Sequence, residues 1–168
     1  MMKKVLLIIL ILAATLTADA QIKFGYLSYD NALKNMPDSK VASLNLEKLR
    51  SQYSNETKRA ENEFNEKYES FLEGQRDFAE PILKKRQAEL QELLSKNEAF
   101  KKESDRLLLQ AESDMYRPLY ERLNAVLKRI GHERGYAFIL NTDNNAVPFV
   151  NSAYGEDITT IVSDALRE

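Results

Sequence analysis

Apolar residues recur at helical spacing from residue 38 to residue 130, and charged residues fill most of the positions between them. In the first half of this region the apolar positions advance by 3, 4, 4, 3, 4, 4 and 3 residues: Leu46, Leu49, Tyr53, Thr57, Ala60, Phe64, Tyr68 and Phe71. The 3-4-4 unit in this series is an 11-residue repeat, which averages about 3.67 residues per turn and favours a straight or slightly right-handed seam between helices. A second series follows in the other half: Leu83, Leu90, Leu93, Phe100, Leu107, Leu108, Ala111, Met115, Leu119, Leu123, Val126 and Ile130. Asn97 and Ser104 interrupt this second series, which predicts a partly polar, loosely packed middle of the seam.

Gly74 and Pro81 lie at the boundary between the two series. Proline lacks an amide donor and disfavours helix at the residue before it, so Pro81 fits the first turn of a second helix. One unbroken helix would have to run through both Pro81 and Pro118, so we favour a hairpin with its turn near residues 74–82. Two helices of roughly 40 and 50 residues would extend about 60–75 Å at 1.5 Å per residue. Pro118 is expected to kink the second helix.

A short strand and a short helix are predicted before the hairpin. Apolar residues alternate with other residues at the start of this segment, as in a half-buried strand: Ile22, Phe24 and Tyr26. Residues 29–36 can form one or two helical turns that Pro37 ends. Asp38 and Ser39 then offer side-chain oxygens that can cap the first long helix.

Strand signals return after the hairpin. Residues 136–140 form a compact apolar run of strand length, and residues 142–145 are typical of a turn. Residues 147–150 are interpreted as a returning strand, in which Pro148 cannot donate a ladder hydrogen bond and so favours an edge position.

Glycines and an aspartate are expected to bound the helices in this part of the chain. Gly131 and Gly135 can end the long helix. Asp157 can cap a final helix whose apolar residues fall on one face: Ile158, Ile161, Val162, Ala165 and Leu166. The expected fold class is therefore α+β and mostly α, with a helical hairpin arm at residues 38–130 and a small β-rich body.

The predicted body comprises residues 21–37 and 131–168, which is too little chain to bury a large core. An open three-stranded sheet also leaves edges that proteins cover, pair or close. The body is therefore expected to form an obligate oligomer, and its own apolar strand residues are the candidates for the oligomer core: Phe24, Tyr26, Phe138, Leu140, Val147 and Phe149.

The first twenty residues read as a secretory signal peptide. Lys3 and Lys4 precede an apolar run at residues 5–14, and Ala18-Asp19-Ala20 supplies the small-x-small pattern of a cleavage site. The apolar run is short for a bilayer span, which needs roughly 20 apolar residues. Cleavage after Ala20 and export across a membrane are expected, with an uncleaved N-terminal anchor as the alternative.

Composition narrows the function classes. Charged residues make up 30% of the chain, cysteine is absent and there is a single histidine. These counts exclude disulfides, thiolate metal sites and a cysteine nucleophile, and they disfavour a multi-histidine metal centre. The formal net charge of −2 provides no electrostatic footprint for nucleic acid. We therefore predict no catalytic site, no cofactor and no metal.

The densest basic cluster lies just after the expected turn: Lys84, Lys85 and Arg86. Such a run is commonly a solvated helix face. Alternatively, it can attract acidic partners or lipid phosphates to the end of the hairpin.

The order of signal peptide, strand, long helical hairpin, strand pair and amphipathic helix resembles the Skp/OmpH family of periplasmic chaperones over the whole mature chain. The matching residues lie at Lys23-Phe24-Gly25-Tyr26-Leu27, at Gly135-Tyr136-Ala137-Phe138-Ile139-Leu140-Asn141 and at Asp157-Ile158-Thr159. None of these segments is a catalytic signature.

The resemblance implies a homotrimer shaped like a jellyfish, in which strands of three chains form a small β-barrel and three arms enclose a cavity. It further implies a periplasmic holdase that keeps unfolded outer-membrane proteins from aggregating without ATP. Lipopolysaccharide or a membrane surface is a further partner for some members. On this interpretation the tip residues are candidates for client binding: Phe78, Ile82, Lys84, Lys85 and Arg86. Hairpin packing is the alternative for Phe71 and Leu83 nearby.

Two other function classes are the alternatives. An enzyme is disfavoured because no constellation of catalytic groups can be assembled, and His132 beside Gly131 is better explained as part of a helix end. An exported coiled-coil scaffold or adaptor of the cell envelope would share the hairpin and the oligomer, and it stays as the alternative because fold alone does not fix function.

Overall fold

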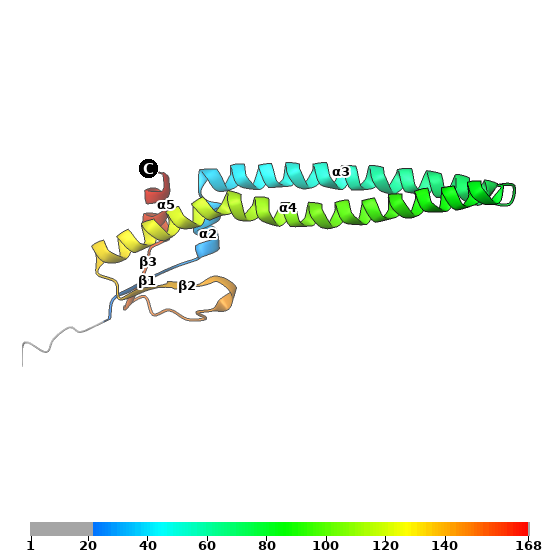
Figure 1. Cartoon of the computed structure of the whole chain (residues 1–168). Coiled ribbons are helices and arrows are strands. Elements are labelled where there is room, and N and C mark those ends of the chain that lie inside the picture. Colours follow the sequence, from blue (N-terminus) through cyan, green and yellow to red (C-terminus); the bar gives the residue numbers. More distant parts are fainter. Residues whose placement is uncertain (1–21, 168) are drawn as a thin grey trace, which may run out of the picture. The chain divides into compact units, whose positions relative to one another are not determined.

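The computed structural model describes residues 22–167, and the predicted signal peptide at residues 1–20 lies outside this range (Figure 1). The described chain divides into two compact units. One, the hairpin unit, is Met36–Glu121, and the other, the sheet unit, combines residues 22–35 with residues 122–167. No described helix is both long and apolar enough to cross a membrane.

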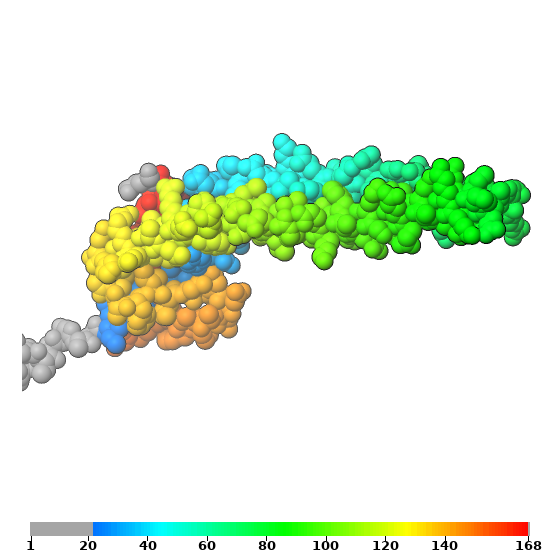
Figure 2. Space-filling model, in the orientation of Figure 1, coloured from blue at the N-terminus to red at the C-terminus, as the bar shows by residue number. Residues whose placement is uncertain are grey.

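The hairpin unit consists of two antiparallel helices, α3 (Pro37–Gly74) and the larger part of α4 (Glu80–Arg134). The two helices lie side by side along the hairpin (Figures 1 and 2). The predicted hairpin is thus confirmed, and the chain reverses between Gly74 and Glu80. The amides of Ile82 and Leu83 donate to the Ala79 carbonyl at 2.9 and 3.0 Å, which starts the second helix.

Gly74 at the end of α3 gives room for a close approach of the Phe78 ring. A Cβ atom on Gly74 would lie 2.5 Å from Cζ of Phe78, well inside van der Waals contact. The Phe78 ring also packs on Phe71, with ring centroids 6.4 Å apart. The half-buried Phe78 therefore closes the end of the hairpin over a position that has no side chain.

The seam follows the two predicted apolar series with one exception. Leu46 and Leu119 are buried in the hairpin unit, and most other members of both series there are at least half-buried. Tyr68 is the exception, since 44% of it is exposed. The polar middle is not loose in its hydrogen bonding, because Asn97 Nδ2 donates across the hairpin to the Ala60 carbonyl at 3.0 Å. Ser104, which is 4% exposed, donates to the Phe100 carbonyl at 2.8 Å.

Two prolines sit within the long helices. Pro37 is the first residue of α3, where the missing proline amide costs no hydrogen bond. The expectation that Pro37 precedes the helix is therefore wrong, and so is the expectation that Asp38 or Ser39 caps the helix. Met36 is the residue before the helix and makes no side-chain cap hydrogen bond. Pro118 lies inside α4, which continues through it to Arg134. Gly135 then adopts a left-handed conformation with φ +66°, as expected of a glycine that ends a helix.

The sheet unit contains three short parallel strands in the order β2-β1-β3: β1 (Phe24–Leu27), β2 (Phe138–Asn141) and β3 (Gly155–Asp157). The predicted returning strand at residues 147–150 is wrong. That segment is irregular, and the third strand is formed by Gly155–Asp157 instead. Parallel strands cannot be joined by a tight turn, so residues 142–154 must carry the chain back past β1 before β3 begins.

Each face of this sheet has a distinct composition because successive strand residues point to opposite sides. Gly25 and Leu27 lie on the face that is covered by protein, and Leu27 is only 2% exposed. Two short helices, α2 (Tyr29–Lys34) and α5 (Thr159–Arg167), contact each other within this unit. The core on this side is entirely apolar: Leu27, Ala32, Leu33, Leu123, Val126, Ile130, Ile158, Val162 and Leu166.

Short helices in the sheet unit are capped by side chains. Ser28 Oγ accepts from the Asn31 amide at 3.1 Å at the start of α2. Asp157 Oδ1 accepts from the Thr159 amide at 2.9 Å, as predicted for the last helix. The apolar face predicted for that helix is also confirmed, because Ile158, Val162 and Leu166 are buried.

Candidate functional site

The predicted tip residues differ in their surroundings. Phe78 is half-buried against Phe71 and Gly74, so most of its ring is engaged in closing the hairpin. Ile82 is 49% exposed and remains available to a partner.

The basic cluster after the turn is paired with carboxylates of its own helix. Lys84 Nζ lies 2.7 Å from Glu80 Oε1, and Lys85 and Arg86 both reach Glu89, at 3.6 and 3.2 Å. All three cations are largely exposed, so each pair contributes only about 0–1 kcal/mol. The cluster is therefore a solvated surface whose positive charge is partly offset by Glu80 and Glu89.

An open hollow of about 760 Å³ lies between the two helices in the distal part of the hairpin. Its floor is apolar: Phe71, Phe78, Leu90 and Leu93. Its rim carries both signs of charge: Glu66, Lys67, Arg86, Glu89, Glu92 and Lys96. A hollow with this lining can receive an apolar side chain, and its mixed rim favours neither an acidic nor a basic ligand.

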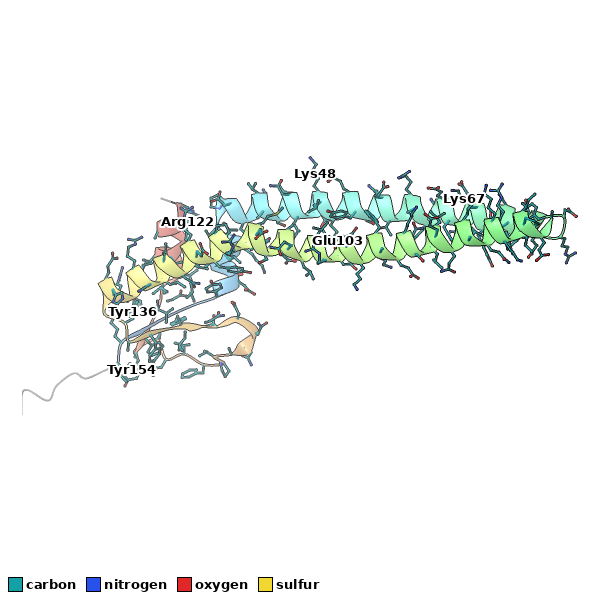
Figure 3. All side chains as sticks on the ribbon, viewed as in Figure 1. Lys48, Lys67, Glu103, Arg122, Tyr136 and Tyr154 are labelled. Carbon is teal, nitrogen blue, oxygen red and sulfur yellow. The ribbon has the colours of Figure 1, made fainter. Side chains whose placement is uncertain are left out.

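Several charged side chains of the hairpin form ion pairs along their own helix. Lys67 pairs with Glu63 at 2.9 Å and Lys96 pairs with Glu92 at 2.6 Å. Figure 3 shows side chains projecting from both helices along the hairpin. Hydrogen bonding to the cations holds the pKa of Glu63 and of Glu92 below the usual value for glutamate.

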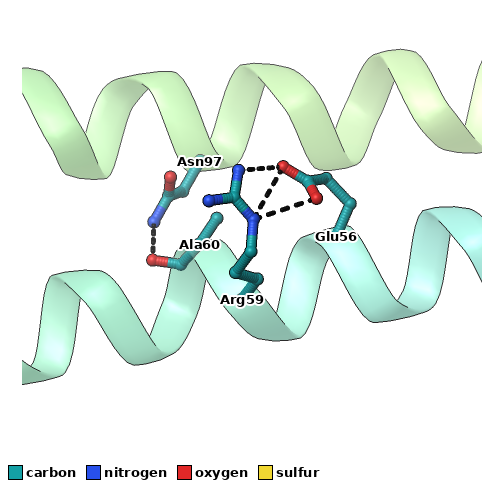
Figure 4. A network of polar contacts seen from close by, with 4 residues as sticks. All are labelled: Glu56, Arg59, Ala60 and Asn97. Atoms are coloured by element: carbon teal, nitrogen blue, oxygen red, sulfur yellow. Dashed lines mark hydrogen bonds and ion pairs between the residues drawn. The ribbon is translucent and has the colours of Figure 1, made fainter.

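The middle of the hairpin contains the polar arrangement shown in Figure 4. Arg59 binds both carboxylate oxygens of Glu56, which lowers the pKa of that carboxyl group and raises the pKa of the guanidinium. One turn away, Asn97 on α4 donates to the carbonyl of Ala60 on α3. A polar residue at a seam position fixes the register of two helices, so Asn97 has a structural role here.

Exposed apolar side chains are numerous on the hairpin unit: Val41, Leu44, Tyr68, Leu72, Ile82, Leu94, Leu109 and Tyr120, which are between 37 and 68% exposed. The sequence patterns did not single out Tyr68 and Leu72 as surface residues. The apolar series places Tyr68 in the seam, whereas the four-residue spacing of Tyr68 and Leu72 shows that they share one helix face.

The sheet unit exposes apolar residues outside the covered face. Phe24 and Phe138 stack with ring centroids 5.4 Å apart, and Phe138 is 46% exposed. Phe149 is 79% exposed and Tyr154 is 51% exposed. Of the other residues predicted for an oligomer core, Tyr26, Leu140 and Val147 are half-buried. In the sheet of the described residues β2 and β3 are the two edge strands, and an edge strand presents backbone groups with which a further strand can pair.

One polar cluster joins the strands to the end of α4. Glu156 accepts a hydrogen bond from the Tyr136 hydroxyl at 2.5 Å, pairs with Arg134 at 2.9 Å and lies 3.5 Å from Lys23. Burial and the bond to Glu156 raise the pKa of Tyr136 to about 12, and the same bond lowers the pKa of Glu156. A tyrosine held neutral against an ionised carboxylate is suited to fastening β3 in place. Within residues 22–167 no three side chains are grouped to hold a metal ion.

Comparisons with known proteins agree with this arrangement. The family model for outer membrane protein (OmpH-like) matches residues 23–166. The crystal structure of an OmpH-like protein from Caulobacter crescentus CB15, described as an outer membrane chaperone, superposes with a TM-score of 0.71. The two chains are 17% identical, and the match covers 89% of this chain and 86% of the Caulobacter chain. A comparison with curated proteins gave no significant match. Because the family model spans most of its length, the chain belongs to the OmpH-like outer membrane protein family.

Proposed function

We propose that the protein is a holdase chaperone of the periplasm that binds unfolded outer-membrane proteins after export and keeps them from aggregating without ATP. Membership in the OmpH-like family and the fold shared with an outer membrane chaperone support this proposal. A holdase needs no chemistry, because reversible binding to the unfolded state lowers the concentration of the species that aggregates.

The observation that carries the proposal is the surface of the hairpin unit. Soluble proteins usually bury large apolar side chains or scatter them singly, whereas α3 and α4 expose a series of them. Leu109 is 68% exposed and Leu44 is 63% exposed, on helices along which several charged side chains form ion pairs within the same helix. Such a surface can bind many apolar segments weakly.

Apolar contact is expected to dominate client capture. The formal net charge of the chain is −2, and the basic cluster at the tip is paired with Glu80 and Glu89. Long-range attraction of acidic clients is therefore weak, and any electrostatic contribution is local and falls with salt. Lys84, Lys85 and Arg86 would then affect the rate of encounter more than the affinity.

Self-association completes the proposal. The sheet unit has two open strand edges, and three of its large apolar residues are about half or more exposed: Phe138, Phe149 and Tyr154. In a ring of three copies, β2 of one chain would pair with β3 of the next, which would leave no free edge. Phe24, Phe138 and Leu140 would then contribute to a shared core.

The test is native mass spectrometry of residues 21–168, alone and after dilution of a urea-unfolded outer-membrane barrel into the protein. We expect three copies that take up one client chain without nucleotide. Light scattering of the diluted barrel should fall in parallel. A protein that assembles but leaves the barrel to precipitate would refute the holdase assignment and favour the envelope scaffold.

A further inference from the structure

A groove in the sheet unit is formed between β2 and the last turns of α4, whose ribbons run near each other in Figure 1. We name this hollow, which extends from Leu127 and Gly131 on α4 to Phe138 and Ile139 on β2, the β2–α4 groove. Its volume is about 430 Å³, within the usual range for sites that bind small molecules. All of its lining residues belong to the sheet unit.

The walls of the β2–α4 groove are mainly apolar. Leu27 and Ile139 line it from the covered face of the sheet, and Leu127 lines it from α4. A Cβ atom added to Gly131 would lie 3.7 Å from Cδ1 of Ile139, so the missing side chain leaves Ile139 accessible beneath the helix. The four residues of β2 span about 10 Å at 3.3 Å per residue. The groove is thus long and wide enough for one short alkyl chain.

Two basic side chains line the same groove from α4. Lys128 and His132 are four residues apart, so they lie on one face of the helix. Among residues 22–167 neither side chain forms an ion pair or a hydrogen bond. Their neighbours Arg129 and Glu133 pair with each other at 3.6 Å, which leaves the charge of Lys128 without compensation on its own helix.

The acidic residue that follows β2 is engaged elsewhere. Asp143 accepts hydrogen bonds from the Ser28 hydroxyl at 2.5 Å and from the Asp30 amide at 2.8 Å. These bonds hold its carboxylate at the start of α2. Asp143 is therefore committed to capping that helix and is not paired with Lys128.

The charge of its lining distinguishes the β2–α4 groove from the hollows of the hairpin unit. Within residues 22–167, no aspartate or glutamate lines the groove. The larger hairpin hollow has Glu66, Glu89 and Glu92 beside its cations, and a smaller one of about 320 Å³ has Glu61 and Glu98. An anion is therefore repelled by carboxylates in both hairpin hollows and attracted by the lining of the groove.

We propose that the β2–α4 groove binds an amphiphile with one alkyl chain and a carboxylate headgroup, namely a short fatty acid. The alkyl chain lies along Leu127 and Ile139, where its removal from water is favourable. The carboxylate accepts charge-assisted hydrogen bonds at the α4 rim from Lys128 and His132.

The proposed site is independent of client binding on the hairpin. It is also compatible with pairing of a further strand at the edge of β2. Such pairing uses backbone groups of the strand, whereas side chains line the groove. The inference therefore stands or falls separately from the proposed holdase function.

Three ligands with the same alkyl chain test the preference for an anion: octanoate, octanol and octylammonium. His132 is the single histidine of the chain, so in untagged protein the imidazole C–H signals of an NMR titration report on the groove directly. At one fixed pH and ionic strength, octanoate should shift these signals saturably, with a Kd at least five-fold lower than that of octanol. Octylammonium should bind more weakly than octanol. The absence of a saturable shift, or equal Kd values for octanoate and octanol, would overturn the proposal.

Matched variants separate the headgroup from the alkyl chain. Lys128→Gln should raise the Kd for octanoate about five-fold and change the Kd for octanol less than two-fold. Lys48→Gln removes the same charge from an exposed position on α3 and should leave both values within two-fold. Leu127→Ala should weaken both ligands. Equal effects of Lys128→Gln and Lys48→Gln on octanoate would refute the headgroup site, and both lysines are exposed, so neither change is expected to unfold the chain.

A second copy of the chain is the other occupant that this groove could accept. Sedimentation velocity of the unsubstituted protein should give the same sedimentation coefficient with and without saturating octanoate. Dissociation of an oligomer by octanoate would show that another copy fills the groove and would overturn the proposal. Suppression of barrel aggregation, measured without octanoate, tests the holdase function alone.

Discussion

The centre of the sheet unit offers a test of whether β1 is as tightly packed as its geometry indicates. Gly25 lies in the central strand, and a Cβ added to it would meet Cε2 of Tyr136 at 3.1 Å and two carbon atoms of Ile158 at 3.2 Å. Ile158 is fully buried, so it has little room to move away. Gly25→Val should therefore overpack this site and lower the free energy of unfolding by about 1–3 kcal/mol, despite the strand preference of valine.

The reciprocal change makes the test specific. Ile158→Ala alone should cost about 2–5 kcal/mol, because it leaves a cavity under β1. In the double variant the valine methyl groups occupy that cavity, so the cost should be at least 1 kcal/mol smaller than the sum of the single costs. Urea unfolding followed by circular dichroism, at one fixed protein concentration, measures all four proteins. Costs that add to within about 0.3–0.5 kcal/mol would show that the two residues do not share space and would refute the packing argument.

Other substitutions test the oligomer, the acid stability and the tip. Leu140→Asp should give monomeric or unfolded protein in analytical ultracentrifugation, because the substitution places a charge in the expected shared core. Phe149→Ser should weaken assembly without unfolding the chain. An intact oligomer in both variants would contradict the proposed interface. Hydrogen bonds from Tyr136 and Ser28 lower the pKa values of Glu156 and Asp143. The two carboxylates therefore contribute fully to the free energy of unfolding above their unfolded pKa values of about 4.3 and 3.9. This contribution is lost as the pH falls through the lower pKa values of the folded protein. Thermal melts should accordingly show a steeper loss of Tm below about pH 4 in the unsubstituted protein than in Glu156→Gln, and parallel curves would refute this role of Glu156. Changing Lys84, Lys85 and Arg86 together to glutamate should slow client association at low salt and reduce its salt dependence in stopped-flow fluorescence, and an unchanged rate would exclude a contribution of the cluster.

Local chemistry in the sequence was sufficient to predict the hairpin and the ends of several helices. Apolar steps of three and four residues require a buried seam, and Gly74 with Pro81 leaves one place for the chain to reverse. Gly135 ends α4 and Asp157 caps α5 because both act on neighbouring backbone groups within a few residues. Such interactions depend on sequence separation alone, so no knowledge of the fold is needed to anticipate them.

Other features depended on residues that are distant along the chain. Residues 147–150 have the composition of a strand, yet β1 pairs with Gly155–Asp157. The connection before this strand has no local sequence pattern that predicts where the parallel pairing begins. Asn97 weakens the apolar series of α4, and only the hairpin places the Ala60 carbonyl where its amide can donate. Tyr68 fits the helical period of the seam, but packing leaves it exposed beside Phe64. The sequence by itself thus determined which long segments are helical and where several of them end, since those preferences are local. Only the tertiary structure decided which strand completes the sheet and which apolar residues remain on the surface, because both follow from contacts between distant segments.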